Sequence, residues 1–236
     1  CLIYLGYFQP DGEESALLHA RRMLDRFPED GREFMYVIVW ASRRLRRYDE
    51  AYQCASEGIQ RFRDDPRFWH GQSLTMFSWF RDPTHRDSWR FAGLDAIAHL
   101  QKAAELYARN GEQNRVLLGA AHCNVAYFSC IEDPAWNAYD VERAVADLNW
   151  LKHYVPPDQW YPAYPEYFHA EAMVTYHVFR RDRDANVSGK RLLAELDCAE
   201  KSNEAALELF TKQSFLMLRE QIAAARVEVL SRQTET

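Results

Sequence analysis

Residues 34–69 read FMYVIVWASRRLRRYDEAYQCASEGIQRFRDDPRFW. Apolar side chains recur at steps of three and four on both sides of the charged break at Arg47–Asp49, which is the spacing of one buried helix face. The second run closes at Asp64-Asp65-Pro66, because proline cannot continue a helix that precedes it. The stretch therefore predicts two helices joined by a short turn. The apolar positions are Phe34, Val37, Ile38 and Ala41 before the break, and Ala51, Tyr52, Ala55, Ile59 and Phe62 after it.

The same helical spacing continues through the rest of the 236 residues. Upstream, a first run begins at Ala16 and ends at Pro28. Alternation with a period of two, the mark of half-buried strands, is not sustained anywhere in the sequence. We therefore predict an all-α fold, with insertions between paired helices near 81–94 and 132–139. Further helices are expected at 67–80, 92–110, 113–131, 138–155, 164–181, 189–200 and about 203–232.

A spaced pattern of small and apolar residues repeats along these helices. It reads Ala16-x3-Ala20-x2-Met23-x4-Pro28, then Ala51-x3-Ala55-x2-Gly58-x4-Arg63, then Ala144-x3-Leu148-x2-Leu151-x4-Pro156. The small residue lets two helices approach closely, and the larger ones fill the groove between them. A helical hairpin cannot bury its apolar stripe alone, so it must stack on a neighbour, as in a solenoid. The pattern predicts an array of helix pairs.

The sequence resembles the tetratricopeptide repeat family. The resemblance rests on YDEA at Tyr48–Ala51, on DDPRFW at Asp64–Trp69 and on the Leu118-Gly119 pair. It implies a right-handed α-α superhelix in which four or five degenerate helix pairs form a single domain over residues 1–236. It also implies a protein-interaction module, because the first helix of each pair in that family lines a concave groove that holds a peptide or partner element.

Carried over to the best-matching pair, the resemblance places Glu33, Tyr36, Trp40, Arg43 and Arg44 on the groove face as partner-binding residues. Independently of any family, steps of three and four place four of these on one helical stripe, Arg43 excepted. Aromatic residues and arginine are typical of interface hot spots. The alternative is that the two aromatic residues pack against a neighbouring helix while the arginines are solvated.

Other binding functions receive less support. The run of arginines from Arg43 to Arg47 could contact phosphates, but the formal net charge of the chain is -6, which does not favour nucleic-acid binding. The aromatic and proline-rich segment 160–168 suits either a rigid joint between helix pairs or a site for a proline-rich peptide, a small molecule or nucleic acid.

No catalytic, metal or cofactor motif is complete. His169-Ala170-Glu171 lacks the P-C-x-x-C that a zinc deaminase requires. Ser188-Gly189-Lys190 lacks the preceding glycine of a phosphate-binding loop. His122 and Cys123 are adjacent on a helix, where neighbouring side chains diverge. We therefore expect no enzyme activity, no metal and no cofactor.

The cysteine content, the hydropathy and the first residue of the sequence indicate the setting of the chain. Five cysteines favour reduced thiols and a cytoplasmic location, and no apolar stretch approaches the roughly 18 residues of a membrane span. The chain begins with Cys1 rather than Met, which suggests a segment of a longer protein. The alternative function is accordingly a regulatory or sensor segment that controls an adjacent catalytic domain.

The long C-terminal helix is expected to cap the last helix pair, or alternatively to form a homodimer. Its predicted apolar stripe consists of Leu207, Phe210, Leu218, Ile222, Ala225 and Val229.

Overall fold

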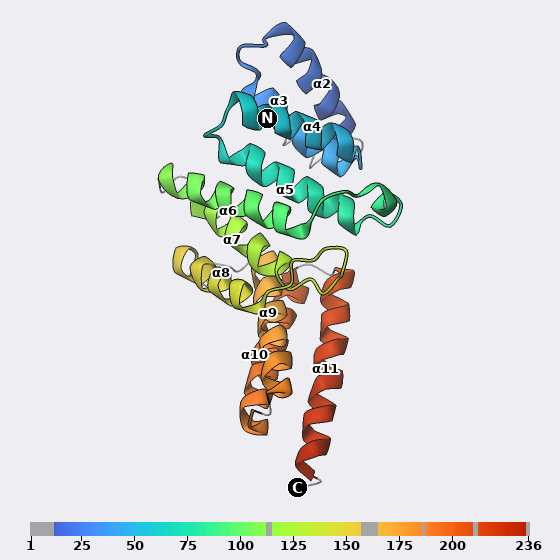
Figure 1. The fold of residues 1–236 in the computed structure, drawn as a ribbon, viewed down its shortest axis with the longest axis vertical. Coiled ribbons are helices and arrows are strands. Elements are labelled where there is room, and N and C mark those ends of the chain that lie inside the picture. Colours follow the sequence, from blue (N-terminus) through green and yellow to red (C-terminus); the bar gives the residue numbers. More distant parts are fainter. Residues whose placement is uncertain (1–11, 112–114, 157–164, 186, 210–211, 235–236) are drawn as a thin grey trace. The chain divides into compact units, whose positions relative to one another are not determined.

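The computed structural model describes residues 12–111, 115–156, 165–185, 187–209 and 212–234. Within these residues the chain forms α-helices and one short 3₁₀ helix, and no strand (Figure 1). The prediction of an all-α fold is therefore confirmed. The helices are α2 (Gly12–Arg26), α3 (Gly31–Arg44), α4 (Tyr48–Arg61), α5 (Pro66–Arg81), η1 (Arg86–Ser88), α6 (Gly93–Arg109), α7 (Arg115–Phe128), α8 (Val141–Tyr154), α9 (Pro165–Asp184), α10 (Gly189–Leu209) and α11 (Gln213–Thr234).

The charged breaks identified in the sequence end and begin helices as expected. Between α3 and α4, Arg46 adopts a left-handed backbone with φ of 59°, which turns the chain within three residues. Before α5, the Asp65 carboxylate accepts a hydrogen bond from the backbone N–H of Arg67 at 3.0 Å, and Pro66 occupies the first helical position. Both features favour helix initiation at this point.

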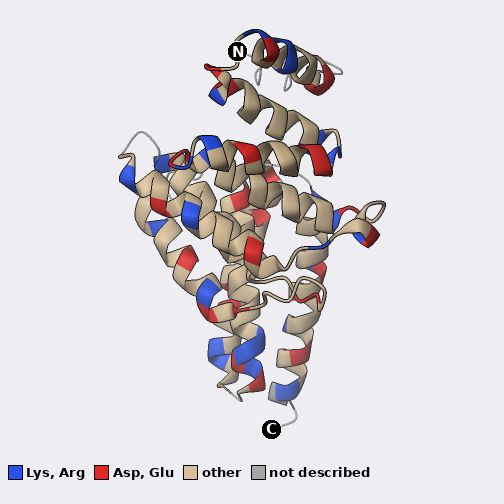
Figure 2. Cartoon of the chain, turned by 45° about the horizontal axis from the view of Figure 1, so that its top comes forward, with Lys and Arg blue, Asp and Glu red and all other residues tan. Residues whose placement is uncertain are grey.

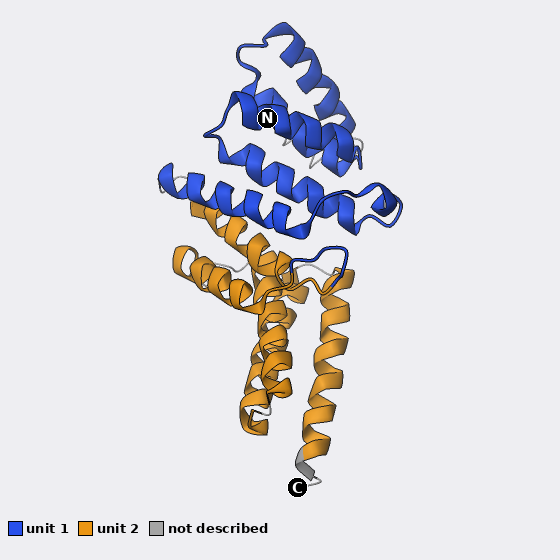
Figure 3. Cartoon of the chain, viewed as in Figure 1, with its two compact units in different colours: residues 1–114, 133–138 blue, residues 115–132, 139–236 orange. Residues whose placement is uncertain are grey.

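Contacts divide the chain into two compact units (Figure 3). Unit 1 consists of residues 1–114 and 133–138, and unit 2 of residues 115–132 and 139–236. Within each unit, every helix packs against the next one along the chain. In addition, α3 contacts α5 in unit 1, and α7 contacts α9 in unit 2. Each unit is thus built from neighbouring helices that shield one another's apolar faces.

The repeated small positions lie at these helix contacts. Ala16 and Ala20 on α2, and Ala51 and Ala55 on α4, have no exposed surface. A Cβ atom added to Gly58 would lie 2.3 Å from a ring carbon of Phe68. The small residue therefore sets the close approach of α4 and α5.

The two predicted insertions pack against one another in unit 1. Trp136, at the centre of the 133–138 segment, is fully buried and stacks on Trp89 at a centroid distance of 5.8 Å. Its carbonyl accepts a hydrogen bond from the backbone N–H of Gly93 at 2.7 Å. Asp133 pairs with Arg86 of η1. Residues of both insertions therefore pack in the core of unit 1.

The predicted break between 189–200 and 203–232 is wrong. Helix α10 continues to Leu209, and α11 begins only at Gln213. Ser202 and Asn203, at the predicted break, are buried within α10 and find tertiary partners. Ser202 donates to Glu171 at 2.8 Å, and the Asn203 amide donates to the Phe215 carbonyl at 2.9 Å.

Helix α11 packs in unit 2 as the C-terminal element. Its residues Leu218, Ile222, Ala225 and Val229 form a buried cluster with side chains of α9 and α10, so this part of the predicted stripe lies in the core. Leu207 belongs to α10 instead, and Phe210 lies outside the described residues. No helix in the described ranges is both long and apolar enough to cross a bilayer.

Candidate partner-binding site

The structure places the five predicted groove residues against two different neighbours. Trp40 is only 7% exposed and packs in a cluster with Ala16, Leu17 and Ala20 of α2. The Arg44 guanidinium lies 5.6 Å from the centroid of the Trp40 ring and donates to Glu13 at 2.8 Å. The Trp40 side chain therefore helps to join α3 to α2.

The other three predicted groove residues face α5. Glu33 and Arg67 form a bidentate ion pair with two contacts of 2.7 Å, and the Arg67 guanidinium lies 5.2 Å from the Tyr36 ring centroid. Arg43 donates to Ser78 on α5 at 3.3 Å. Glu33, Tyr36 and Arg43 thus lie along the α3–α5 contact, apart from Trp40 and Arg44 at the α2 contact.

Arg67 is held by two carboxylates. Besides Glu33, it contacts Asp65 through Nε at 3.0 Å and Nη2 at 2.7 Å. The hydrogen bonds that Arg67 donates to Asp65 and Glu33 raise the pKa of Arg67 above its ordinary value, and they lower the pKa of Glu33. The Glu33 carboxylate is therefore ionised at neutral pH, and two carboxylates face the single positive charge of Arg67.

A cavity of about 640 Å³ opens beside this triad, within the size range of ligand pockets. It lies where the first turns of α3 and α5 meet the last turns of α4 and α6. Its lining is strongly charged, with two aromatic side chains among the charged ones. The lining residues are Arg32, Arg61, Phe62, Arg63, Asp64, Asp65, Pro66, Arg67, Tyr107 and Asn110. We call this the arginine cavity.

Two arginines of the cavity gather around one aromatic ring. The guanidinium of Arg32 lies 5.1 Å from the Phe62 centroid, and that of Arg61 lies 5.4 Å from it. Arg61 also donates to the Pro28 carbonyl at 2.8 Å and contacts Glu57 at 3.3 Å. These contacts fix Arg61 more firmly than Arg32, whose only ion pair within the described residues is to Asp65 at 3.9 Å.

Arginines outnumber aspartates in the lining of the cavity, four to two. Two of these arginines are paired with glutamates outside the lining, Arg61 with Glu57 and Arg67 with Glu33. Arg63 is exposed and forms no ion pair within the part of the chain that the structure describes. Along the helices as a whole, positive and negative residues are interspersed (Figure 2).

Sequence reasoning missed this cavity. Its arginines come from three helices and a turn, and residues 64–69 were interpreted only as a helix break and as a motif of the resemblance. The feature that could have indicated the cavity is the high density of charged residues in RFRDDPR, residues 61–67. This segment ends one helix and begins the next.

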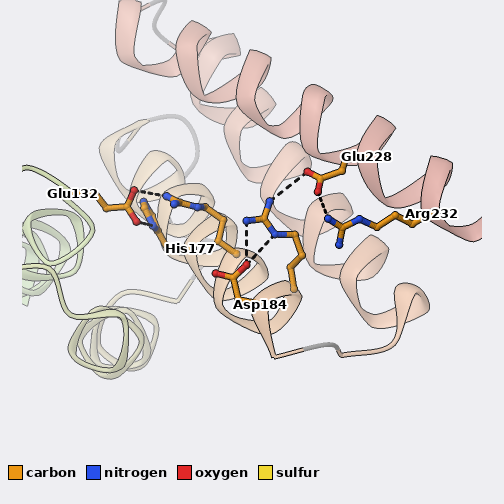
Figure 4. Close-up of polar contacts among 7 residues, drawn as sticks. Glu132, His177, Asp184, Glu228 and Arg232 are labelled. Carbon is orange, nitrogen blue, oxygen red and sulfur yellow. Dashed lines mark hydrogen bonds and ion pairs between the residues drawn. The ribbon is translucent and has the colours of Figure 1, made fainter.

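Unit 2 contains a charged cluster of a different kind (Figure 4). Glu132 contacts both Arg180 and His177, the latter at 3.8 Å. Arg183 contacts Asp184 at 3.1 Å and Glu228 at 3.3 Å. Burial lowers the pKa of His177 to about 4, so its contact with Glu132 is not an ion pair at neutral pH. We interpret these contacts as two structural sets, one that joins the α7–α8 connection to α9 and one that joins α9 to α11.

Other candidates from the sequence have structural contacts where they are described. His122 pairs with Asp147 at 2.7 Å and stacks on Trp150, 5.3 Å between centroids, an arrangement that spacing alone did not reveal. Tyr167 is buried and donates to the Val116 carbonyl at 3.0 Å, whereas residues 157–164 of the aromatic segment lie outside the described residues. Within the described ranges, no group of three His, Cys, Asp or Glu side chains is placed to hold a metal ion.

A scan against protein-family models found no matching family, and a search of curated proteins found no match.

Proposed function

We propose that the chain is a helical-repeat, tetratricopeptide-like module that binds a protein or peptide partner through unit 1. The solenoid part of this proposal is supported by the packing within each unit. Successive helices pair, and alternate helices also touch, α3 with α5 and α7 with α9. That is the neighbour-to-neighbour pattern of stacked helical hairpins.

The arginine cavity is the observation that carries the binding proposal. It is an open concavity lined by arginine and aromatic side chains, and such side chains dominate protein-binding hot spots. Arg67 of its lining pairs with Glu33 and lies over the Tyr36 ring, so two of the predicted groove residues contact the cavity lining. The proposal does not include Trp40, whose side chain is buried against α2.

Affinity capture with matched variants tests this function. The chain is used as bait in an extract of its native cell, and the captured proteins are quantified for wild type, Arg63→Glu and Arg22→Glu. Arg63 lines the cavity, whereas Arg22 is an exposed arginine on α2 outside it. Both variants change the net charge equally, and circular dichroism checks that both remain folded.

The expected result is a partner that Arg63→Glu loses and Arg22→Glu retains. A Trp40→Ala variant is unsuitable here, because truncation of a buried tryptophan costs about 3–5 kcal/mol of stability and abolishes binding by unfolding. If the captured proteins are the same for all three baits, the cavity is not the binding surface.

A further inference from the structure

We propose that the arginine cavity binds a run of consecutive acidic side chains on the partner protein. The inference rests on the proposed function and names the chemistry of the partner.

The first step is the charge that remains after internal pairing. Arg67 is satisfied by Asp65 and Glu33, and Arg61 is engaged by a backbone carbonyl and by Glu57. Among the described residues, Arg32 forms one long ion pair, to Asp65 at 3.9 Å, and the Arg63 side chain forms none. Guanidinium groups bind carboxylates through paired, charge-assisted hydrogen bonds, so these two arginines are the anchors for acidic groups.

The second step is the crowding of like charge. Arg32 and Arg61 both lie against the Phe62 ring, and Arg63 is the next residue along the chain. Cations held close together repel one another, and an anion placed among them replaces repulsion with attraction.

The third step is the shape of the site, which favours a peptide over a nucleic acid. Nucleic-acid binding requires basic residues spread along a stripe or face that follows the phosphate backbone. Here four arginines line one cavity, while charges of both signs are interspersed along the helices (Figure 2). The cavity also contains Phe62 and Tyr107, whose rings can cover the methylene groups of glutamate side chains. A short acidic segment matches both the confined charge and this lining.

Fluorescence anisotropy tests the inference with the full chain. The probe is a fluorescein-labelled peptide of six glutamates, titrated with wild type, Arg32→Glu, Arg63→Glu and the charge-matched control Arg22→Glu. We expect saturable binding that weakens as salt is added. Arg32→Glu and Arg63→Glu should each raise the dissociation constant by about tenfold or more, since each replaces an attraction with a repulsion. Arg22→Glu should change it by less than about threefold, because that residue acts only at long range.

Three results would overturn the inference. One is an equal dissociation constant for Arg63→Glu and Arg22→Glu. Another is no saturable binding of the glutamate peptide by wild type. A third is tighter binding of a labelled twelve-nucleotide single strand than of the peptide, with the same dependence on Arg63, which would assign the cavity to phosphates. If the peptide arm fails while capture from the extract still depends on Arg63, the interaction function stands and only the acidic partner is wrong.

Discussion

Replacement of Gly58 by alanine tests the helix contact on which unit 1 is built. Gly58 lies in the last turn of α4 and is buried against Phe68 of α5. An added Cβ would lie 2.3 Å, 2.5 Å and 2.6 Å from three ring carbons of Phe68. Phe68 has no exposed surface and is enclosed by Phe62, 5.8 Å away, and by Tyr36, 6.5 Å away between centroids. The ring therefore has no open space into which it can retreat.

Two opposing effects determine the change in stability. Alanine gains about 1 kcal/mol over glycine within a helix. Overpacking of a filled core costs about 1–3 kcal/mol and sometimes more, and contacts this short on an enclosed ring belong at the upper end. We expect Gly58→Ala to lower the free energy of unfolding of unit 1 by about 2 kcal/mol, the steric cost being the larger effect.

Urea denaturation followed by circular dichroism measures this change. With a denaturant dependence of about 2 kcal/mol per molar urea, the midpoint should fall by about 1 M. Gly71→Ala is the matched control, since Gly71 is also buried within a helix but its added Cβ meets only a Val39 methyl at 3.0 Å. That variant should differ from wild type by less than about 1 kcal/mol, because the methyl can yield and the gain in helix propensity offsets the strain.

A double-mutant cycle identifies the ring as the cause. Phe68→Leu removes the atoms that the new methyl would meet, so Gly58→Ala should be less destabilising in that background, by a coupling of about 1 kcal/mol or more. If Gly58→Ala is as stable as wild type, or if its cost is unchanged in the Phe68→Leu background, then close approach of α4 and α5 does not depend on the small residue.

Three further measurements test individual contacts. Asp65→Ala should destabilise unit 1 by about 1–3 kcal/mol through loss of the α5 cap and of an Arg67 partner, whereas Glu33→Gln, at an exposed pair, should cost less than about 1 kcal/mol in the same urea titration; equal costs would contradict the assigned roles. Burial lowers the pKa of His70 from 6.5 to about 4, so between pH 6.5 and 4 the unfolded state binds a proton that the folded state does not. As the pH falls through this range, the free energy of unfolding of wild type should fall by up to about 1.4 kcal/mol per pH unit more than that of His70→Gln. Identical pH profiles would show that His70 is not held neutral. Ile222→Ala, at a residue 1% exposed, should cost about 2–5 kcal/mol, and Val227→Ala, at one 65% exposed, less than about 0.5 kcal/mol; similar values would mean that α11 is not packed on α9 and α10.

Local features of the sequence predicted much of the fold. Helical spacing and the Asp64-Asp65-Pro66 break depend on neighbouring residues, and they predicted α3, α4 and α5 with ends correct to within a few residues. The burial of the repeated small positions was also predictable, because a small residue at a regular helical position allows two helices to approach closely. The break near residue 201 was predicted wrongly, since Ser202 and Asn203 find hydrogen-bond partners on other helices and the sequence does not show such partners.

The candidate site was less predictable, because its residues meet only through tertiary packing. Helical spacing placed Glu33, Tyr36, Trp40 and Arg44 on one stripe, but it did not indicate which neighbour each part of the stripe would meet. The structure buries Trp40 against α2 and pairs Glu33 with α5. The arginine cavity combines Arg32 with residues some thirty positions later in the chain, a separation over which local periodicity carries no information.

The arginines of the cavity have different roles, and the difference follows from how their charges are balanced. Arg67 lies between Asp65 and Glu33, so an incoming carboxylate would have to compete with two that are already in place. Arg63 is exposed and has no such competitor among the described residues. Substitution of Arg67 therefore changes the α3–α5 contact whether or not a partner is present, whereas substitution of Arg63 changes only what the cavity can attract. A loss of binding on substitution of Arg63 is therefore informative about the ligand. The same loss on substitution of Arg67 reports on the fold.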